Sequence, residues 1–225
     1  MHNGNKILAV IPAKGKSKRL PEKNLKHLAG KPLVGWTIEQ AKASQVIDYT
    51  VLSTDCKKIA YIAEGFGVDR IIDRPPELAT DTATTEDVVL HVLQELPDKY
   101  NIIVMLQPTS PLRYSTDIDE AVKLLVNTPK ATSVVGITQF KAVIVYLEMD
   151  RIINDVTDHE YYRSNGAIYV IYTKALEKEY TFYTKYCKHY LMPENRSVDI
   201  DTYFDFDVAD CLMRRRLNES SSYRV

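Results

Sequence analysis

Cysteine is scarce in this chain, and its few cysteines form no recognisable pair. Cys56, Cys187 and Cys211 are an odd number, widely spaced, and no Cys-x-x-Cys occurs. Such a set gives neither a disulfide framework nor a zinc site, and it fits a reducing compartment. The sequence also lacks an apolar signal segment at its start, and its longest apolar runs, such as 102–106, have the length of a strand. We therefore expect a cytoplasmic protein that does not span a membrane.

Familiar catalytic motifs are absent as well. There is no Gly-x-x-x-x-Gly-Lys-Ser/Thr phosphate loop, no Gly-x-Ser-x-Gly turn and no His-Glu-x-x-His helix. Gly65-Phe-Gly67 lacks the third glycine and the strand–turn–helix setting of a dinucleotide fingerprint. Four of the five histidines are scattered singly, without the orienting partners that catalysis needs: His27, His91, His159 and His189.

A strong charge of either sign is missing too. The chain has 29 Lys and Arg residues against 30 Asp and Glu, a formal net charge of −1. A general nucleic-acid binder would normally be strongly basic, so that class is not expected. With 225 residues, 45% of them hydrophobic, and no repeat or linker, the chain is expected to form one domain over residues 1–225.

Positive charge is concentrated in one loop near the N-terminus. The loop follows the apolar run Ile7–Ile11, which reads as a buried strand, and carries Lys14, Lys16, Lys18, Arg19 and Lys23. Open α/β sheets bind ligands beyond the carboxyl ends of their strands, so the loop is suited to a triphosphate. A Lys-rich loop is also commonly just a solvated surface, and alone it does not establish a site.

Two carboxylates near the C-terminus form a second candidate site. Asp199 and Asp201 are two residues apart in an extended stretch, so both side chains point to the same side of the chain. Convergent carboxylates suit Mg²⁺, which prefers oxygen ligands and substrate phosphates. Turn or cap chemistry is the alternative for such a pair. Taken together, the basic loop and the carboxylate pair indicate a nucleotide enzyme.

Strand-like and helix-like segments alternate along the first half. Strands are predicted at 7–11, 48–53, 68–72 and 102–106, and helices at 32–44, 55–66, 86–96 and 117–126. This βαβ repetition predicts an α/β fold with a mostly parallel sheet and helices on both faces.

The second half is less regular. Strands are predicted at 133–137, 142–147 and 167–171, an edge strand at 186–191, and a short helix at 174–178. Thr202-Tyr-Phe-Asp205 is a capping-box variant that opens a final helix. Its acidic start, Asp205 and Asp207, and a basic end at Arg214, Arg215 and Arg216 suit the helix dipole. Asp199 and Asp201 lack such a structural explanation.

Six short motifs occur in the order found in one enzyme family: Ile11-Pro-Ala-Lys-Gly-Lys-Ser-Lys-Arg-Leu-Pro-Glu-Lys-Asn24, Leu52-Ser-Thr-Asp55, Arg74-Pro-Pro-Glu-Leu-Ala79, Leu106-Gln-Pro-Thr-Ser-Pro-Leu-Arg113, Asn165-Gly-Ala-Ile-Tyr169 and Asp199-Ile-Asp-Thr202. In these motifs the chain resembles the acylneuraminate cytidylyltransferase (CMP-sialic acid synthetase) family, with its legionaminic and pseudaminic acid members and, more distantly, CMP-Kdo synthetase. The resemblance implies a Rossmann-like nucleotidyltransferase fold with a small dimerisation extension, here at about 138–172. It also implies transfer of CMP from CTP to the anomeric hydroxyl of a nine-carbon 2-keto sugar acid, with release of pyrophosphate.

The resemblance also implies roles on the nucleotide side. Lys14, Ser17 and Lys23 match phosphate-binding positions, and Lys14 and Lys23 act in catalysis together with Asp199 and Asp201. Lys16, Lys18 and Arg19 either contact phosphate directly or only raise the local potential. The positions used around ribose and cytosine are Asn24, Arg74, Ala83 and Thr85, with Ala83 acting through its backbone.

The metal and sugar sides are implied in the same way. Asp199 and Asp201 match the Mg²⁺ ligands, and the sugar side is matched by Gln107, Arg163, Asn165 and Tyr169. Gln107 is equally explained as an amide that organises the loop beside Pro108, and Tyr169 as an aromatic of the strand core. An arginine fork at position 163 suits the carboxylate of the acid.

Two departures from the family pattern leave questions open. Lys14 stands where the family usually has arginine, which keeps the charge and loses the bidentate fork. The segment between Ile137 and Arg163 is short and lacks the usual Arg-Gln-bearing stretch of the dimerisation arm. A C₂ homodimer is still expected, because strands at 142–147 and 167–171 lie where the family builds its dimer.

Three functions therefore remain. A cytidylyltransferase for a sialic-acid-like sugar is preferred. A nucleotidylyltransferase of the same fold for another sugar, such as Kdo, or another base is the second. A noncatalytic nucleotide- or sugar-binding protein is the third, and it has no need of the paired carboxylates Asp199 and Asp201.

Overall fold

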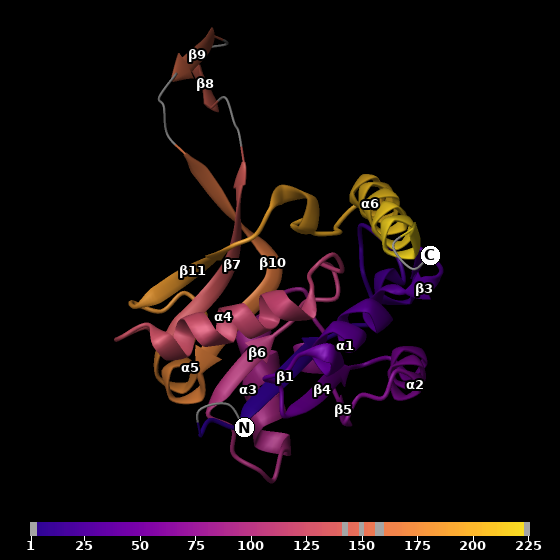
Figure 1. Ribbon diagram of the computed structural model, residues 1–225, viewed down its shortest axis with the longest axis vertical. Coiled ribbons are helices and arrows are strands. Elements are labelled where there is room, and N and C mark those ends of the chain that lie inside the picture. The colour runs from indigo at the N-terminus through magenta and orange to yellow at the C-terminus, as the bar shows by residue number, and fades with distance from the viewer. Residues whose placement is uncertain (1–3, 141–143, 149–150, 156–159, 223–225) are drawn as a thin grey trace.

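The structure, a computed structural model, describes residues 4–140, 144–148, 151–155 and 160–222. Its centre is a seven-stranded sheet (Figure 1). The strands stand in the order β11 (Cys187–Leu191), β7 (Ser133–Phe140), β10 (Tyr161–Tyr172), β6 (Ile102–Met105), β1 (Ile7–Pro12), β4 (Tyr49–Thr54) and β5 (Arg70–Asp73). Of these seven, β10 alone runs antiparallel to its neighbours. The prediction of a mostly parallel sheet is confirmed, and the strand predicted at 186–191 does lie at an edge.

Helices cover both faces of the sheet. One face carries α1 (Leu33–Ala43), α2 (Lys57–Gly65) and α4 (Ser115–Asn127), and the other carries α3 (Thr85–Glu95) and α5 (Thr173–Glu179). The last helix, α6 (Tyr203–Ser222), packs beside the start of α1 and against the small hairpin of β2 (His27–Leu28) and β3 (Lys31–Pro32). Single turns of 3₁₀ helix lie in the loops: η1 (Lys23–Leu25), η2 (Pro76–Leu78) and η3 (Glu194–Arg196). The predicted helices 32–44, 55–66, 86–96, 117–126 and 174–178 are all present.

The strand β1 lies inside the sheet and is covered on both faces, which explains why its sequence is a continuous apolar run. Residues Ile7–Ile11 of β1 are fully buried. Ile7, Ala9 and Ile11 pack toward α1, α2 and α4, whereas Leu8 and Val10 pack toward α3 and α5. A parallel strand covered on both faces is buried on both faces, so it does not alternate between apolar and polar residues.

The strand order fixes where a ligand can bind. After β1 the chain continues to β4 and β5 on one side, and then returns to β6 on the other side of β1. The connections therefore diverge at the carboxyl ends of β1 and β6, which is where open α/β sheets form ligand crevices. The basic loop leaves β1 at this edge.

A hairpin of β8 (Ile144–Glu148) and β9 (Arg151–Asp155) projects beyond the ends of β7 and β10, at the top of Figure 1. The strand predicted at 142–147 corresponds to β8 from Ile144 onward, and residues 142 and 143 lie outside the described residues. The strand predicted at 167–171 is longer than expected, because β10 begins at Tyr161 and crosses a bulge between Ser164 and Tyr169. The strand β9 was not predicted. The role of this arm in dimerisation stays a prediction.

The capping box at the start of α6 is confirmed, but the predicted basic end of that helix is wrong. Thr202 N donates to Asp205 Oδ2 at 2.8 Å, and Asp205 N donates to Thr202 Oγ1 at 3.2 Å. The helix continues past Arg216 to Ser222, so the three arginines lie in its middle and its last turn has no basic residue. Arg214 and Arg215 instead pair with acids four residues away along the helix. No helix in the described part of the chain is long and apolar enough to cross a membrane.

Candidate active site

The carboxyl ends of four parallel strands carry polar side chains that gather at one edge of the sheet. Lys14 follows β1, Asp55 follows β4, Arg74 follows β5 and Gln107 follows β6. A cavity of about 350 Å³ lies there. It is lined by every predicted nucleotide residue except Ser17, together with Gln107 and both aspartates: Lys14, Lys23, Asn24, Arg74, Ala83, Thr85, Gln107, Asp199 and Asp201. We call it the central cavity.

Two further cavities adjoin the central cavity. The basic cavity, about 450 Å³, holds Ser17, Lys16 and Lys18 and shares Lys14 and Asp81 with the central cavity. The outer cavity, about 830 Å³, is lined by residues that include Arg19 and Arg163, and it shares Asp199 and Asp201 with the central cavity. We call these three cavities together the groove, because the central cavity shares lining residues with each of the other two. Cations line the basic cavity, and the carboxylate pair lies on the wall common to the central and outer cavities.

The basic loop and the carboxylate pair are in direct contact. Lys23 Nζ donates to the Ile200 carbonyl at 2.7 Å and pairs with Asp201 Oδ1 at 3.1 Å. Arg19 Nη2 pairs with the other oxygen of Asp201 at 2.7 Å. Segments far apart in the sequence therefore meet around a single carboxylate. Because these groups are mutual counter-ions, an incoming polyphosphate and cation can exchange partners with them without leaving charge unpaired.

Asp199 stands on the wall shared by the central and outer cavities. Its residue surface is exposed to solvent, but protein surrounds much of the carboxyl group. This loss of hydration, and then the neighbouring Asp201, raise the pKa of the Asp199 carboxyl, while a hydrogen bond from Thr109 and the charge of Lys23 oppose the shift. A raised pKa means that the carboxylate lacks compensation for its charge, and a bound cation would supply it.

The two carboxylates of Asp199 and Asp201 are ligands of the kind through which proteins usually bind Mg²⁺. Among the described residues, no group of three or more His, Cys, Asp or Glu side chains converges as a metal cage. Mg²⁺ typically binds through one or two carboxylates and completes its shell with substrate phosphates and water. Asp199 and Asp201 provide two carboxylates on the wall of a cavity that the basic loop also lines.

The lysines of the basic loop have an internal counter-ion in Asp81. Lys14 Nζ lies 2.9 Å from Asp81 Oδ1, and Lys18 Nζ lies 2.6 Å from Asp81 Oδ2. Hydrogen bonds from Lys18 and then Lys14 lower the pKa of the Asp81 carboxyl to about 2. Asp81 lines both the basic and the central cavity, so its carboxylate marks a place where these lysines bind an anion.

The peptide between Lys14 and Gly15 is held from both sides. Asn24 Nδ2 donates to the Lys14 carbonyl at 2.9 Å, and Gly15 N donates to Asp55 Oδ1 at 2.7 Å. A Cβ on Gly15 would lie 2.8 Å from the Cβ of Cys56, so only glycine fits this close approach. Asn24 is 7% exposed, and its Oδ1 has no hydrogen-bond partner within the described ranges, which leaves an acceptor for a ligand donor.

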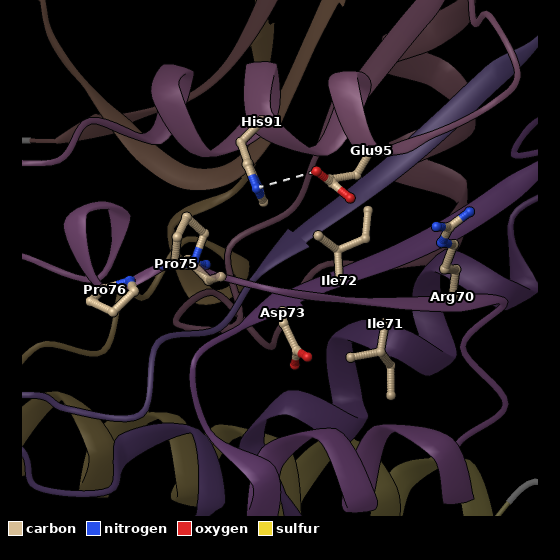
Figure 2. A pocket seen from close by; sticks show the side chains of 9 residues that line it. Arg70, Ile71, Ile72, Asp73, Pro75, Pro76, His91 and Glu95 are labelled. Carbon is tan, nitrogen blue, oxygen red and sulfur yellow. Dashed lines mark ion pairs between the residues drawn. The ribbon is translucent and has the colours of Figure 1, made fainter.

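Arg74 forms part of the opposite wall of the central cavity. Its Nε and Nη2 donate to the Ser53 hydroxyl at 3.2 Å and the Ser53 carbonyl at 2.8 Å. Burial lowers the pKa of Arg74 to about 10, with the charge of Asp55 opposing. Behind Arg74 lies a separate cavity of about 530 Å³ along β5, where His91 and Glu95 of α3 face each other (Figure 2). Arg74 therefore separates this cavity from the candidate site.

The predicted sugar residues divide into two groups. Gln107 and Arg163 line cavities of the groove. Asn165 is buried beneath the β10 bulge, where its Nδ2 donates to Ser197 Oγ at 3.0 Å and its Oδ1 accepts from Ala167 N at 3.1 Å. Tyr169 packs on Phe182, bonds Ser164 Oγ at 2.9 Å, and has its pKa raised by burial. The structure thus places both Asn165 and Tyr169 behind the groove rather than among the residues that line it.

Sequence reasoning assigned no role to several residues at the groove. Thr109 stands within a quoted motif and Asp81 lies close to another, and both line the central cavity, whereas Asp55, also within a motif, supports the basic loop through Gly15 N. A motif does not say which of its members face a cavity. Gly166, with φ +68°, approaches so closely that a Cβ there would lie 2.5 Å from Gln107 Oε1 and 3.3 Å from Asp199 Oδ2. A glycine within a strand often marks a bulge or a close approach of the backbone, so Gly166, between Asn165 and Ala167, was the feature of the sequence that could have indicated this contact.

A mostly parallel sheet with a basic loop and a pair of carboxylates at its switch point defines a nucleotide-binding protein of Rossmann-like fold. The chain belongs to the cytidylyltransferase family, whose family model matches residues 8–210.

Curated relatives agree with this family. An N-acylneuraminate cytidylyltransferase of Escherichia coli is 34% identical over 223 residues, covering 94% of this chain and 53% of the relative, so the chain spans about half the length of that protein. A CMP-N,N'-diacetyllegionaminic acid synthase of Legionella pneumophila is 34% identical, with 92% and 96% covered. A pseudaminic acid cytidylyltransferase of Campylobacter jejuni is 28% identical, with 97% and 100% covered.

Solved structures share the fold. A CMP:2-keto-3-deoxy-manno-octonic acid synthetase, determined in complex with CTP, has a TM-score of 0.74 at 16% identity and covers 94% of this chain and 99% of its own. A 4-diphosphocytidyl-2C-methyl-D-erythritol synthase from Anaerococcus prevotii has a TM-score of 0.71 at 17% identity, covering 94% and 97%. The predicted nucleotidyltransferase fold is confirmed.

Proposed function

We propose that the protein transfers CMP from CTP to the anomeric hydroxyl of a sialic-acid-like nine-carbon 2-keto sugar acid and releases pyrophosphate. The observation that carries this proposal is the contact between Lys23 of the basic loop and Asp201 of the carboxylate pair, at the edge of one cavity. Family membership supports cytidylyl transfer, and the names of the relatives support the class of acceptor.

Phosphoryl transfer requires positioning and charge stabilisation more than covalent chemistry. Lys14, Ser17 and Lys23 would hold the triphosphate with charge-assisted hydrogen bonds of about 1.5–3 kcal/mol each. Lys14 would release Asp81 as phosphate oxygens replace that carboxylate. Lys16 and Lys18, on the exposed side of the basic cavity, would raise the local positive potential.

The nucleoside would be held on the opposite side of the central cavity. The unpartnered Oδ1 of buried Asn24 would accept from an amino or hydroxyl group of the nucleoside. Arg74, the backbone of Ala83 and Thr85 complete this side. A buried acceptor rejects a base that cannot donate to it, because it would then stay unpaired.

Asp199 and Asp201 would hold Mg²⁺. Bound there, the metal would neutralise charge on the α-phosphate and the departing pyrophosphate and lower the pKa of the attacking hydroxyl. Lys23, which pairs with Asp201 in this structure, would remain beside the leaving group as a fixed positive charge.

The sugar acid would occupy the outer cavity. Arg163 and Arg19 line it and present guanidinium groups suited to a carboxylate. Gln107, on the wall of the central cavity, lies between this region and the nucleotide side. A protein of this kind would work as a homodimer in the cytoplasm.

A pyrophosphate-release assay tests the proposal directly. The four nucleoside triphosphates are crossed with N-acetylneuraminic, legionaminic, pseudaminic and Kdo acceptors in the presence of Mg²⁺. We expect turnover with CTP and a nine-carbon acid. Turnover with Kdo alone would favour the second candidate, an eight-carbon acceptor on the same fold. Binding of CTP without turnover of any acceptor would favour a noncatalytic binding protein.

A further inference from the structure

Arg113 is a buried cation that the chemistry above does not use. Its side chain is fully buried. Its hydrogen bonds to the described residues go to neutral oxygens: Nε donates to the Ala167 carbonyl at 2.7 Å, Nη1 to Thr37 Oγ1 at 2.9 Å, and Nη2 to the Gln107 carbonyl. Burial lowers the pKa of Arg113 to about 9, with Asp117 and Asp199 opposing, so the group stays charged at neutral pH.

The three acceptors belong to separate parts of the fold. Gln107 begins the loop between β6 and α4, Ala167 lies in the bulge of β10, and Thr37 lies in α1. A guanidinium is a rigid planar fork, so its bonds fix the spacing of the groups it joins. Through its bonds to the Gln107 and Ala167 carbonyls, Arg113 thus holds the Gln107 loop and the β10 bulge at a fixed spacing from each other, and its bond to Thr37 is a separate attachment to α1.

That spacing matters because the bulge touches the groove. The Cα of Gly166 is packed so closely that an added Cβ would meet both the Gln107 amide and the Asp199 carboxylate. Two more bonds join the same segments. Ser110 Oγ donates to the Asn165 carbonyl at 2.9 Å, and Ile200 N donates to the Thr109 carbonyl at 2.8 Å. The Gln107 loop is therefore the common support of the bulge and of the Asp199–Asp201 segment.

We propose that Arg113 is a positioning residue for the transfer step, which acts by holding Gln107 and Asp199 in the places from which they face the reacting groups. The inference rests on the proposed function, because it assigns a step in that reaction. The nucleotide side of the groove is built from other segments, namely the basic loop, Arg74 and residues 83–85. Loss of the Arg113 fork should therefore impair turnover and sugar use much more than CTP binding.

The test variant is Arg113→Lys, which keeps the charge and loses the fork. Pyrophosphate release gives kcat and the KM of the sugar acid, calorimetry gives the Kd of CTP, and circular dichroism reports folding. We expect kcat to fall about 10- to 100-fold and the sugar KM to rise, since a misplacement of about 1 Å can cost that much. The Kd of CTP should stay within about threefold of the wild-type value.

Two matched variants separate positioning from general support of the fold. Arg216→Lys makes the same change in a half-buried arginine that stacks on Tyr114 and donates to the Leu112 carbonyl at 3.4 Å. Thr37→Val removes a partner of Arg113 that lies on α1, away from the groove. Both should lower the melting temperature and leave the kcat of the folded protein within about twofold. Should Arg113→Lys fail to fold, Ser110→Ala weakens the same support more gently, and it should lower kcat several-fold with unchanged CTP binding.

The inference is overturned if folded Arg113→Lys keeps near-normal kcat, or if its CTP affinity and kcat fall together. It is equally overturned if Thr37→Val and Arg216→Lys lose as much kcat as Arg113→Lys, or if Arg113→Lys does not fold and Ser110→Ala turns over normally. Wild-type protein in the same assay keeps the two proposals distinct. An inactive wild type means that the proposed function is wrong and that this inference falls with it, whereas an active wild type with an active Arg113→Lys removes only the role of Arg113.

Discussion

At the scale of single residues, the groove depends on a few carboxylates with different duties. Asp201 pairs with Lys23 and Arg19, and Asp81 pairs with Lys14 and Lys18. The carboxyl group of Asp199 is partly desolvated, which raises its pKa. Asp55 instead binds a backbone N–H of the basic loop. Carboxylates of the same chemical type thus act as candidate metal ligand, counter-ion or support according to what surrounds them.

Asp199→Asn and Asp201→Asn are each expected to lower kcat about 10²–10³-fold, the usual cost of losing a preorganised electrostatic contact to the transition state. Asn has nearly the same shape, so the fold should remain. The measurement is pyrophosphate release at several Mg²⁺ concentrations, with complete loss of activity in EDTA. Asp207→Asn, at an exposed position in the second turn of α6, is the control and should be neutral. Near-normal rates for the first two variants at limiting Mg²⁺ would mean that the pair is structural.

Asp55 should matter through the Lys14–Gly15 peptide. Asp55→Ala removes the acceptor of the Gly15 N–H and should raise the KM of CTP about tenfold, the cost of losing one charge-assisted bond that orients a charged loop. Asp55→Asn keeps an acceptor oxygen and should recover most of that loss. Steady-state kinetics with varied CTP make the measurement. Equal defects in the two variants would show that the charge of Asp55, and not its hydrogen bond, is what the loop needs.

Gly166→Ala should impair turnover even though it adds only one methyl group. The residue has φ +68°, which disfavours a side chain, and the new Cβ would displace the Gln107 amide. We expect a loss of about 1–3 kcal/mol in stability from the strained backbone, and a lower kcat for the protein that remains folded. Gly67→Ala shares the positive φ but has open space around its Cβ, so it should show the stability loss without the loss of kcat. Denaturant unfolding gives the loss of stability in both variants, and steady-state kinetics show whether kcat falls in Gly166→Ala alone.

At the scale of secondary-structure elements, α6 links the groove to the rest of the fold. Its cap lies directly after Asp201, and Asp205 Oδ2 accepts from Asp201 N at 3.0 Å as well as from Thr202. Ala209 and Met213 anchor the helix against Leu28 and Trp36. The position of the carboxylate pair is therefore coupled to the start of this helix.

Thr202→Ala should destabilise the protein by about 1 kcal/mol, because the capping hydroxyl that accepts from Asp205 N is lost. Thr202→Ser keeps the hydroxyl and should cost only a small part of that. Urea unfolding followed by circular dichroism gives both values. A Thr202→Ala protein as stable as wild type would mean that the cap contributes nothing and that packing alone sets the start of α6.

The elements that could be read from the sequence are those with a strong period or a chemical boundary. The buried runs of β1 and β6 and the helices between them follow from apolar spacing, and the start of α6 follows from its cap. The arm and the early part of β10 could not be read, because residues 161–164 are polar and aromatic and the strand passes through a bulge. The end of α6 was misplaced because Arg214 and Arg215 pair with acids along the helix and do not mark its last turn.

The candidate site was predictable to a similar degree and for related reasons. Residues one or two positions beyond the ends of parallel strands must meet at the carboxyl edge of the sheet, as Lys14, Arg74 and Gln107 do. Whether a side chain in a motif faces the groove or the interior depends on tertiary contacts. Asn165 turns inward because the bulge places it over Ser197, and no spacing rule in the sequence reveals that.

At the scale of the whole molecule, the projecting β8–β9 hairpin is the feature whose stability is hardest to account for in a single protomer. The two strands pair with each other and, among the described strands, with no others. An isolated two-stranded hairpin is marginally stable in water, and packing against a further surface is needed to stabilise it. A second copy of the chain, related by a twofold axis, is the simplest source of such a surface.

We therefore expect a homodimer that depends on this arm. Phe140 of β7 and Tyr161 of β10 are register partners, so an Asn-Gly turn can join them in place of residues 141–160 and leave the main sheet intact. Light scattering at micromolar concentration should give a dimer mass for the full chain and a monomer mass for the shortened one, with equal helix content by circular dichroism. A matched variant that keeps the arm and replaces exposed Tyr61 of α2 by Ser should stay dimeric. A monomeric full chain, or a shortened chain that remains dimeric, would show that the arm does not form the interface.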